Sequence, residues 1–188
     1  MSGVEQALAF GGILSEESIM QAASCFQQRK LRAMEHFHEI NTKANTIAFV
    51  ESGIMRCYSI DNDGNDVTKY FIRENQFSVD LESYYSGAPS EDAIQAMVPC
   101  EIYTIQKSHM NALMEEIPNF FIFFKSVTEA QLLNKMKDND FLNYGSSKTK
   151  YLEFIKRYPK LAQQVPQQFI ASYLKITPQS LSRIRKNI

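Results

Sequence analysis

The sequence contains few cysteines, and their spacing excludes several classes of protein. Cys25, Cys57 and Cys100 are odd in number and far apart, and no CxxC pair is present. A disulfide framework or a zinc ribbon is therefore not expected, and reduced cytoplasmic thiols fit the pattern. The count also excludes a sensor built on a four-cysteine iron–sulfur cluster.

Long apolar runs are lacking as well. The longest candidate, Phe120–Phe124, is far shorter than the roughly 20 residues that span a bilayer. The N-terminus shows no basic segment followed by an apolar core, so no signal peptide is expected. These features predict a cytoplasmic protein without a membrane partner.

Motifs of common enzymes are absent: there is no GxGxxG, no P-loop and no GxSxG. His36-Phe37-His38 begins like a cupin metal motif, but Glu39 and Glu51 both miss the spacing of its metal-binding glutamate. His109 lies near the start of a helical pattern. We expect surface histidines, no metal and no cofactor, and we keep a cupin-like metalloenzyme as a remote alternative.

Charge is nearly balanced overall but is divided unevenly along the chain. The formal net charge is −1, whereas residues 148–188 carry nine Lys or Arg against the single acid Glu153, and residues 1–147 carry −9. A basic module joined to an acidic one suggests that only the C-terminal part meets a polyanion. A solvated basic face would have the same composition, so charge alone leaves both interpretations open.

Residues 46–106 have the pattern of short strands separated by polar turns. The clearest hairpin joins Ile54–Ile60 to Val67–Ile72 through the turn at 61–66, and further strands are expected at 46–50, 94–98 and 101–105. Such spacing predicts an antiparallel roll or barrel. Before it, Ser15 can cap a helix over residues 15–28.

A long helix is expected after Pro118, because apolar residues recur there at intervals of three or four until about Leu142. Its apolar stripe could be core packing or a seam between two helices of a dimer. The residues that we assign to the seam are Phe121, Phe124, Thr128, Leu132 and Met136. The polar cluster at 143–147 then marks a domain boundary.

The most specific pattern lies at residues 166–188, after a further helix expected at 148–158. Helices are predicted at 166–174 and 178–188, with Thr177 as N-cap and Pro178 at the first helical position. Leu181, Ile184 and Ile188 would form the buried edge of the second helix. This is the spacing of a helix-turn-helix, although any pair of antiparallel helices could share it. The turn position that usually holds glycine is Lys175, which predicts a positive φ at about 1 kcal/mol of cost.

At these residues the chain resembles the Crp/Fnr transcription regulators. The segment Phe49–Arg56 resembles the strand–Gly–strand core of that family, Gly64 its hairpin turn, and Phe77–Ile105 its phosphate-binding cassette with the strands that follow. The resemblance ends at Ile188, where the family normally continues into a β-wing, so the chain either resembles a wingless branch or is cut short before the wing. It implies an α+β fold with a cyclic-nucleotide-binding-like β-roll (1–117), a dimerisation helix with hinge (118–145) and a helix-turn-helix domain (146–188). It also implies a homodimer that binds promoter DNA, with RNA polymerase as a further partner.

The cassette departs from the nucleotide-binding pattern where a cyclic phosphate would sit. The phosphate-binding arginine falls on Ser90, Glu91 and Asp92 follow it, and the glycine before the acid Asp80 falls on Val79. Two carboxylates at ~5 Å from a phosphate would each repel it by roughly 3 kcal/mol at an effective dielectric near 20. The resemblance therefore implies an effector pocket but not cyclic AMP, and the effector is unknown. The pocket residues that it implies are Asp80, Leu81, Ser90, Glu91 and Asp92.

The side chains that would read DNA follow from the helical angle of 100° per residue. Gln179 and Arg183 lie opposite the buried edge near the helix start, so they are the expected base readers, while Lys186 should meet phosphate. The whole DNA-binding set is Thr177, Gln179, Ser180, Ser182, Arg183, Arg185 and Lys186. The expected function is a sequence-specific transcription regulator and not an enzyme. The alternative is a ligand-sensing or protein-interaction module that does not read DNA.

Overall fold

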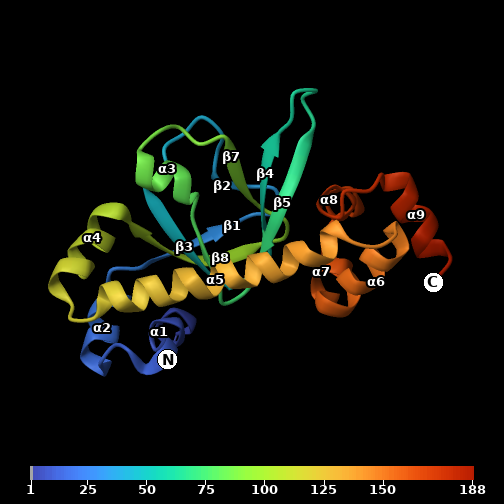
Figure 1. Cartoon of the computed structure of the whole chain (residues 1–188). Helices are drawn as coiled ribbons and strands as arrows, with labels where there is room; N and C mark the ends of the chain where they lie inside the picture. Colours follow the sequence, from blue (N-terminus) through green and yellow to red (C-terminus); the bar gives the residue numbers. More distant parts are fainter. Residues whose placement is uncertain (1) are drawn as a thin grey trace.

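Two antiparallel sheets of four strands each form the N-terminal part of the molecule (Figure 1). The structure is a computed structural model that describes residues 2–188 and, of residues 139 and 140, only the backbone. One sheet has the strand order β1-β8-β3-β6 and the other β2-β7-β4-β5. The strands are β1 (Gln27–Leu31), β2 (His36–His38), β3 (Thr46–Ser52), β4 (Met55–Ile60), β5 (Asp66–Ile72), β6 (Phe77–Ser78), β7 (Asp92–Ala96) and β8 (Cys100–Gln106).

Turn residues fix the register of the sheets. The β4–β5 turn is closed by the Asp61 carboxylate, which accepts hydrogen bonds from the backbone N–H groups of Asp63 (3.0 Å) and Asn65 (2.8 Å). Between β3 and β4, Gly53 has φ +103°, and a Cβ there would lie 2.6 Å from Cys100 Sγ. Only glycine fits this position, because a side chain would meet both an unfavourable dihedral angle and the facing strand.

The core of the roll lies between the two sheets. Alternate residues of each strand point inward, so that Met55 and Ile94 from one sheet share an apolar cluster with Val50 and Ile102 from the other. All four side chains are fully buried. The roll therefore has a packed interior of its own.

Helices flank the roll at both ends. Their bounds are α1 (Gly3–Leu8), α2 (Glu16–Ser24), α3 (Leu81–Ser86), α4 (Lys107–Glu116), α5 (Phe120–Asn143), α6 (Ser147–Arg157), α7 (Pro159–Gln164), α8 (Gln167–Tyr173) and α9 (Pro178–Lys186), and a 3₁₀ turn covers Phe10–Gly12. None of the helices that the structure describes is long and apolar enough to cross a bilayer.

The long helix α5 runs alongside the roll and joins the two groups of helices (Figure 1). At its start, Phe120 and Phe123 pack with Leu8 of α1 and with Met110 and Leu113 of α4. At its end, Leu142 joins a second cluster formed mainly by α6–α9. That cluster also contains Ile54 and Met97, so the C-terminal helices share apolar packing with the roll.

The strands expected at 46–50, 54–60, 67–72 and 101–105 are confirmed to within two residues, and the strand expected at 94–98 lies at Asp92–Ala96. The helix capped by Ser15 is confirmed, but its predicted extent to residue 28 is wrong. It ends at Ser24, because Gln27–Leu31 pairs with β8 instead. The long helix begins at Phe120 rather than Pro118, since Asn119 has φ +64°.

Candidate DNA-reading helix and ligand cavity

The turn between α8 and α9 is built by its own sequence. Lys175 has φ +56°, as expected for the position that usually holds glycine. The Ile176 N–H donates to Ala171 O at 3.0 Å, the hydrogen bond that closes a Schellman turn. Thr177 then caps α9, because its Oγ1 accepts the Ser180 N–H at 3.1 Å, and Pro178 takes the first helical position.

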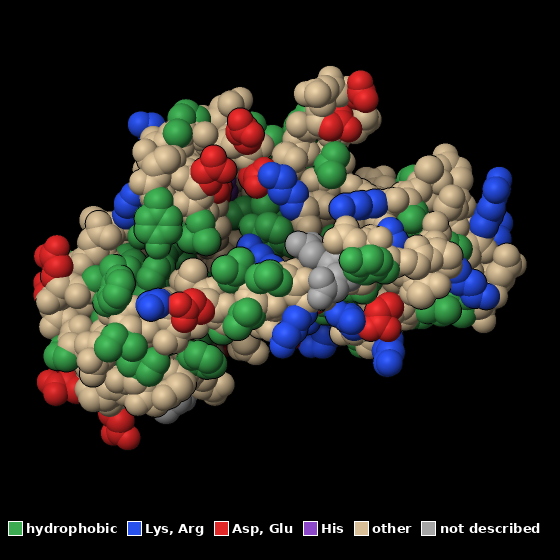
Figure 2. All heavy atoms as spheres, viewed as in Figure 1, with side chains coloured by type: hydrophobic (Ala, Val, Ile, Leu, Met, Phe, Trp, Pro, Cys, Tyr) green, Lys and Arg blue, Asp and Glu red, His purple; other side chains and the backbone are tan. Residues whose placement is uncertain are grey.

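Helix α9 has one buried edge and one open face. Leu181 is fully buried and Ile184 packs against the same apolar cluster. The exposed residues include Gln179, Ser182, Arg183, Arg185 and Lys186, of which Gln179, Arg183 and Lys186 lie opposite Leu181. Lys and Arg side chains gather over this C-terminal part of the molecule, whereas acidic side chains lie mainly over the roll and the N-terminal helices (Figure 2).

The start of α9 is capped by Thr177 as expected, whereas Ile188 beyond its end does not lie where it was expected. Thr177 and Ser180 bond to each other through their hydroxyls at 2.9 Å, and Ser180 is half-buried, so both hydroxyls serve the helix start. Ile188, expected on the buried edge, is 63% exposed. The helix ends at Lys186, and Ile188 therefore does not continue the helical face.

Helix α8 is docked on the outer face of β4 and β5. The guanidinium of Arg56, 2% exposed, lies 4.1 Å from the ring centre of Tyr58 and 3.7 Å from that of Phe169 on α8. Its nitrogens donate to Gln95 Oε1 (3.0 and 3.2 Å), Thr68 Oγ1 (3.2 Å) and Asp66 Oδ2 (2.8 Å). This buried cation therefore connects three strands of the roll to α8.

Two more contacts hold α8 to β5. The Thr68 N–H donates to Ser172 Oγ at 2.9 Å. The rings of Phe71 and Tyr173 meet edge-on, with centroids 5.2 Å apart. Because the docking surface lies on α8, the open face of α9 is turned away from the roll.

The cassette side chains bond to one another instead of leaving an open anion site. The Ser90 hydroxyl donates to Asp80 and lies 2.8 Å from Asp92 O, while Asp80 caps α3 by accepting the N–H groups of Glu82 and Ser83. Asp92 forms a salt bridge with Lys69. Glu91 is exposed, and Leu81 is 38% exposed at the cassette helix.

Behind this cluster lies the buried thiol of Cys57, whose Sγ donates to Asp92 Oδ2 at 3.6 Å. Burial raises the pKa of Cys57 to about 12, so the thiol is neutral at physiological pH. Burial also raises the pKa of the neighbouring Tyr70 phenol well above its usual range. The Cys57 and Tyr70 side chains behind the cassette are therefore neutral and supply no positive charge to a phosphate.

His36 and His38 on β2 make hydrogen bonds within the protein. His36 Nε2 lies 2.9 Å from Tyr58 Oη, and His38 Nδ1 lies 3.4 Å from Thr42 Oγ1. Burial lowers the pKa of His38, which favours the neutral ring. In the part of the chain that the structure describes, no group of three His, Cys, Asp or Glu side chains has the arrangement of a metal site.

A cavity of about 490 Å³ lies between α5 and the strands β5 and β6. Figure 2 shows the hollow above α5 with hydrophobic side chains at its base. Of the five residues that the resemblance assigns to the effector pocket, Leu81 lines this cavity, whereas Asp80, Ser90, Glu91 and Asp92 do not. The cavity therefore borders the start of the cassette at residues 77–79 and Leu81 and extends from there along α5.

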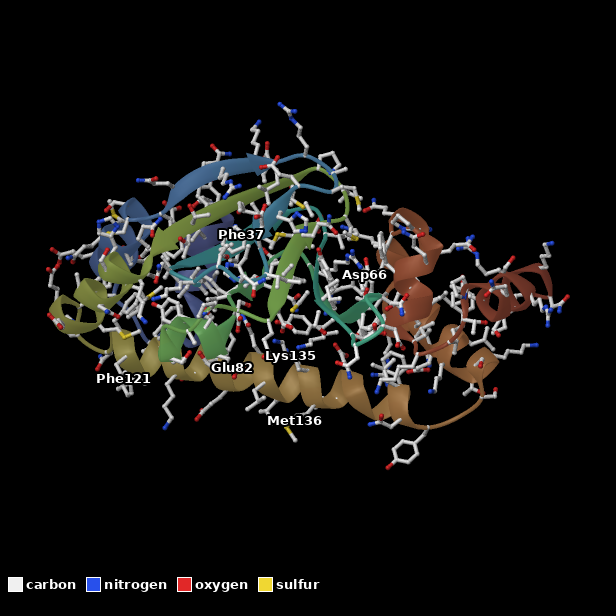
Figure 3. The ribbon with its side chains drawn as sticks, turned by 90° about the horizontal axis from the view of Figure 1, so that it is seen from above. Phe37, Asp66, Glu82, Phe121, Lys135 and Met136 are labelled. Atoms are coloured by element: carbon white, nitrogen blue, oxygen red, sulfur yellow. The ribbon has the colours of Figure 1, made fainter. Side chains whose placement is uncertain are left out.

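Helix α5 presents different residues to the roll and to solvent. Phe124 and Thr128, both expected at the dimer seam, are half-buried on the roll side and line the cavity. Phe121, Leu132 and Met136 are 62%, 57% and 59% exposed. Phe121 and Met136 point away from the roll, whereas Lys135 points toward it (Figure 3).

Sequence reasoning missed Arg56, Ser78 and Lys135 as functional candidates. Arg56 could have been noticed, because a charged residue within a strand of otherwise apolar register indicates a special environment. Ser78 and Lys135 carry no such signal, because they line a cavity whose walls, β6 and α5, are far apart in the sequence.

Comparison with known proteins shows that the chain shares its fold with several solved structures. Residues 28–117 match the model of the cyclic nucleotide-binding domain family. FixK2 from Bradyrhizobium japonicum superposes with a TM-score of 0.70 at 17% identity, covering 86% of this chain and 83% of that one. CLP from Xanthomonas campestris, described as a c-di-GMP responsive global regulator, superposes with a TM-score of 0.69 at 13% identity, covering 92% and 91%.

A protein from Eubacterium rectale, described as a transcriptional regulator of the Crp/Fnr family, superposes with a TM-score of 0.73 at 13% identity, covering 97% of this chain and 87% of that one. No curated protein sequence matches the chain. Residues 28–117 are therefore similar to cyclic nucleotide-binding domains, in a chain that has the overall fold of the Crp/Fnr regulators.

Proposed function

We infer that the chain is a homodimeric, sequence-specific DNA-binding transcription regulator whose effector is not cyclic AMP. In this proposal the sensor domain that binds the effector comprises residues 1–117. The dimerisation helix and hinge comprise residues 118–145, and the helix-turn-helix domain comprises residues 146–188. The observation that carries the proposal is α9: a capped helix with a buried apolar edge and an exposed face rich in Arg, Lys and Gln. A helix presented in this way can enter the major groove of DNA.

The expected roles follow from the position of each side chain on α9. Gln179 and Arg183 are one helical turn apart on the exposed face, near the helix start where base contacts concentrate. Glutamine pairs with adenine and arginine with guanine in the major groove. Lys186 lies almost another turn along and is assigned to phosphate.

The test is selection of bound sequences from random DNA by the purified chain, followed by competition assays with variants. Arg183→Ala should weaken binding to the selected site by about 1–3 kcal/mol and relax the preference at one base pair per half-site. Lys186→Ala, the matched control, should weaken all sequences alike and flatten the salt dependence. If Arg183→Ala leaves the sequence preference intact, α9 does not read DNA in this way.

The cassette supports the second part of the proposal. A cyclic phosphate needs an arginine fork and free N–H donors, but Ser90, Asp80, Asp92 and Lys69 already bond to one another. Calorimetry should therefore detect no binding of cyclic AMP or cyclic GMP at physiological concentration. A micromolar dissociation constant for either nucleotide would contradict this proposal.

The exposed side of α5 supports the dimer. Large apolar side chains lie exposed near its start and in its middle, with Lys125 and Glu129 between them. A group of large exposed apolar residues on one helix marks an interaction surface. Its members are Phe121, Ile122, Leu132, Leu133 and Met136.

A further inference from the structure

The cavity between α5 and the roll extends along most of the helix. Its lining on α5 runs from Phe120 to Asp138, a distance of roughly 27 Å at 1.5 Å per residue. Its volume of about 490 Å³ lies within the usual range for small-molecule sites. An occupant that fills this space is elongated rather than compact.

One end of the cavity is apolar. Helices α1, α4 and α5 meet there, and the lining includes Leu8, Phe26, Met110, Phe120 and Phe123. All five side chains are apolar. An alkyl chain placed against them gains the free energy of apolar burial without leaving a polar group unpaired.

The other end carries positive charge. Lys135 Nζ lies 3.7 Å from the ring centre of Tyr70, and the Arg73 guanidinium lies 4.6 Å from that of Tyr158. Among the described side chains, neither cation has a carboxylate within 4 Å. Lys135 points from α5 toward the strands (Figure 3), and desolvation lowers its pKa.

Most other polar groups of the lining are already bonded within the protein. Lys69 pairs with Asp92, and the Asp138 carboxylate accepts the Tyr158 hydroxyl. Gln131, in the amide orientation that satisfies both of its ends, bonds to the backbone N and O of Phe77 at 3.1 and 3.3 Å.

Ser78 is the exception among these lining groups. Its side chain is 5% exposed, and its hydroxyl has no hydrogen-bond partner among the described residues. A buried hydroxyl without a partner costs free energy that a ligand atom can recover. Lys135, Arg73 and the Ser78 hydroxyl are thus available to a ligand in this cavity.

We propose that this cavity binds an alkyl carboxylate of medium length, with its chain against the Phe120 end and its carboxylate paired with Lys135. The carboxylate supplies the anion that Lys135 lacks, and the chain fills the apolar end. This site lies outside the cassette cluster of Asp80, Ser90 and Asp92. The inference rests on the proposed function only in assigning the ligand as the effector of a regulator.

The experiment is calorimetry on the full-length chain without DNA, using decanoate below its micellar concentration. Decanol and decyltrimethylammonium, which have the same chain with a neutral and a cationic head, are the comparison probes. Decanoate should bind with one molecule per chain and at least about tenfold more tightly than decanol, because one charge-assisted contact is at stake. The cationic probe should bind least.

Variants distinguish pairing of the carboxylate with Lys135 from nonspecific apolar binding. Lys135→Met should reduce the affinity for decanoate to that for decanol and leave the affinity for decanol unchanged. Lys125→Met is the matched control, since Lys125 lies on the exposed part of α5, 3.8 Å from Glu129 and outside the cavity lining. Ser78→Ala should also weaken the binding of decanoate. A melting temperature close to that of the wild type would show that this variant still folds.

Equal affinity for decanoate and decanol, or unchanged decanoate affinity in Lys135→Met, would overturn the proposal. So would absence of binding by all three probes. If only a monomeric variant binds them, a second copy of the chain occupies the cavity and the proposal is again wrong. If the chain binds decanoate but selects no DNA sequence, the ligand site is supported and the regulator function is contradicted. If it selects a DNA sequence but does not bind decanoate, only the ligand site is contradicted.

Discussion

The Arg56 guanidinium occupies an unusual environment for a charged group. It is buried between the rings of Tyr58 and Phe169 and is bonded to Gln95, Thr68 and Asp66. Arginine suits this position, because its planar fork can stack and donate in several directions at once. Its Asp66 partner is 34% exposed, so packing and the bonds to neutral oxygens carry much of the interaction.

We expect Arg56→Ala to lower the free energy of unfolding by about 3 kcal/mol, the low end for a broken buried pair because Asp66 stays partly solvated. Arg56→Lys keeps the charge but loses the fork and the stacking, so it should recover only part of this loss. Urea unfolding at neutral pH measures both. A change below about 0.5 kcal/mol for Arg56→Ala, the size typical of surface substitutions, would mean that the guanidinium does not hold α8.

At the scale of the element, the turn between α8 and α9 combines a favourable hydrogen bond with an unfavourable dihedral angle. Lys175 adopts φ +56° so that the Ile176 N–H can reach Ala171 O. A non-glycine residue in this region costs about 1–2 kcal/mol. The positive φ of Lys175 therefore lowers the stability of the folded chain by an amount that glycine would restore.

Lys175→Gly should stabilise the chain by up to about 1 kcal/mol, since the relief of the dihedral cost exceeds the extra chain entropy of glycine in the unfolded state. Lys175→Ala is the control, because it removes the same charge and keeps the Cβ. Thermal unfolding should rank Lys175→Gly above the wild type and leave Lys175→Ala close to it. Equal melting temperatures for Gly and Ala would show that the turn relaxes when free in solution.

The elements that could be predicted from the sequence are those with a strong local signal. The hairpin at Asp61–Asn65 and the capped start of α9 at Thr177 depend on residues a few positions apart. Strand β1 was missed because four of its five residues are exposed, which leaves no alternation to detect. Helix α7 has six residues, too few for a helical period to show.

The candidate site was less predictable than the fold. The apolar stripe of α5 was visible in the sequence, but its division into a roll side with Phe124 and an open side with Phe121 depends on where the roll lies. The resemblance directed attention to the polar cassette residues such as Asp80 and Ser90, whereas the cavity is lined by the apolar side chain of Val79 and is bounded by α5. The two sides of α5 and the position of the cavity both depend on packing between segments that are far apart in the sequence. Such packing cannot be recognised from local periodicity.

At the scale of the whole molecule, strand β5 connects the cavity to the C-terminal helices. Lys69 and Tyr70 line the cavity, while Thr68 bonds to Ser172 of α8. Phe71 lines the cavity and also packs on Tyr173. A ligand that shifts β5 would therefore act on the docking surface of α8 through direct contacts, which is the physical link that a ligand-controlled DNA-binding protein requires.

Dimerisation through α5 is the remaining requirement, and the exposed face of the helix allows a sharp test. Phe121→Glu and Leu132→Glu each place a charge among the large exposed apolar side chains. In a dimer joined along this face the charge would be buried without a partner, which strongly disfavours association. We expect sedimentation at micromolar concentration to show a dimeric wild type and monomeric variants.

Leu152→Glu is the matched control, since Leu152 is 39% exposed on α6 and lies outside α5; it should remain dimeric. Leu132 also lines the cavity, whereas Phe121 does not, so agreement between the two variants assigns the effect to the seam. Both variants should weaken binding to a two-half-site operator, because each monomer then engages one half-site without the help of a tethered partner. A wild type that sediments as a monomer would instead leave the apolar face of α5 uncovered and would remove the dimer from the proposed function.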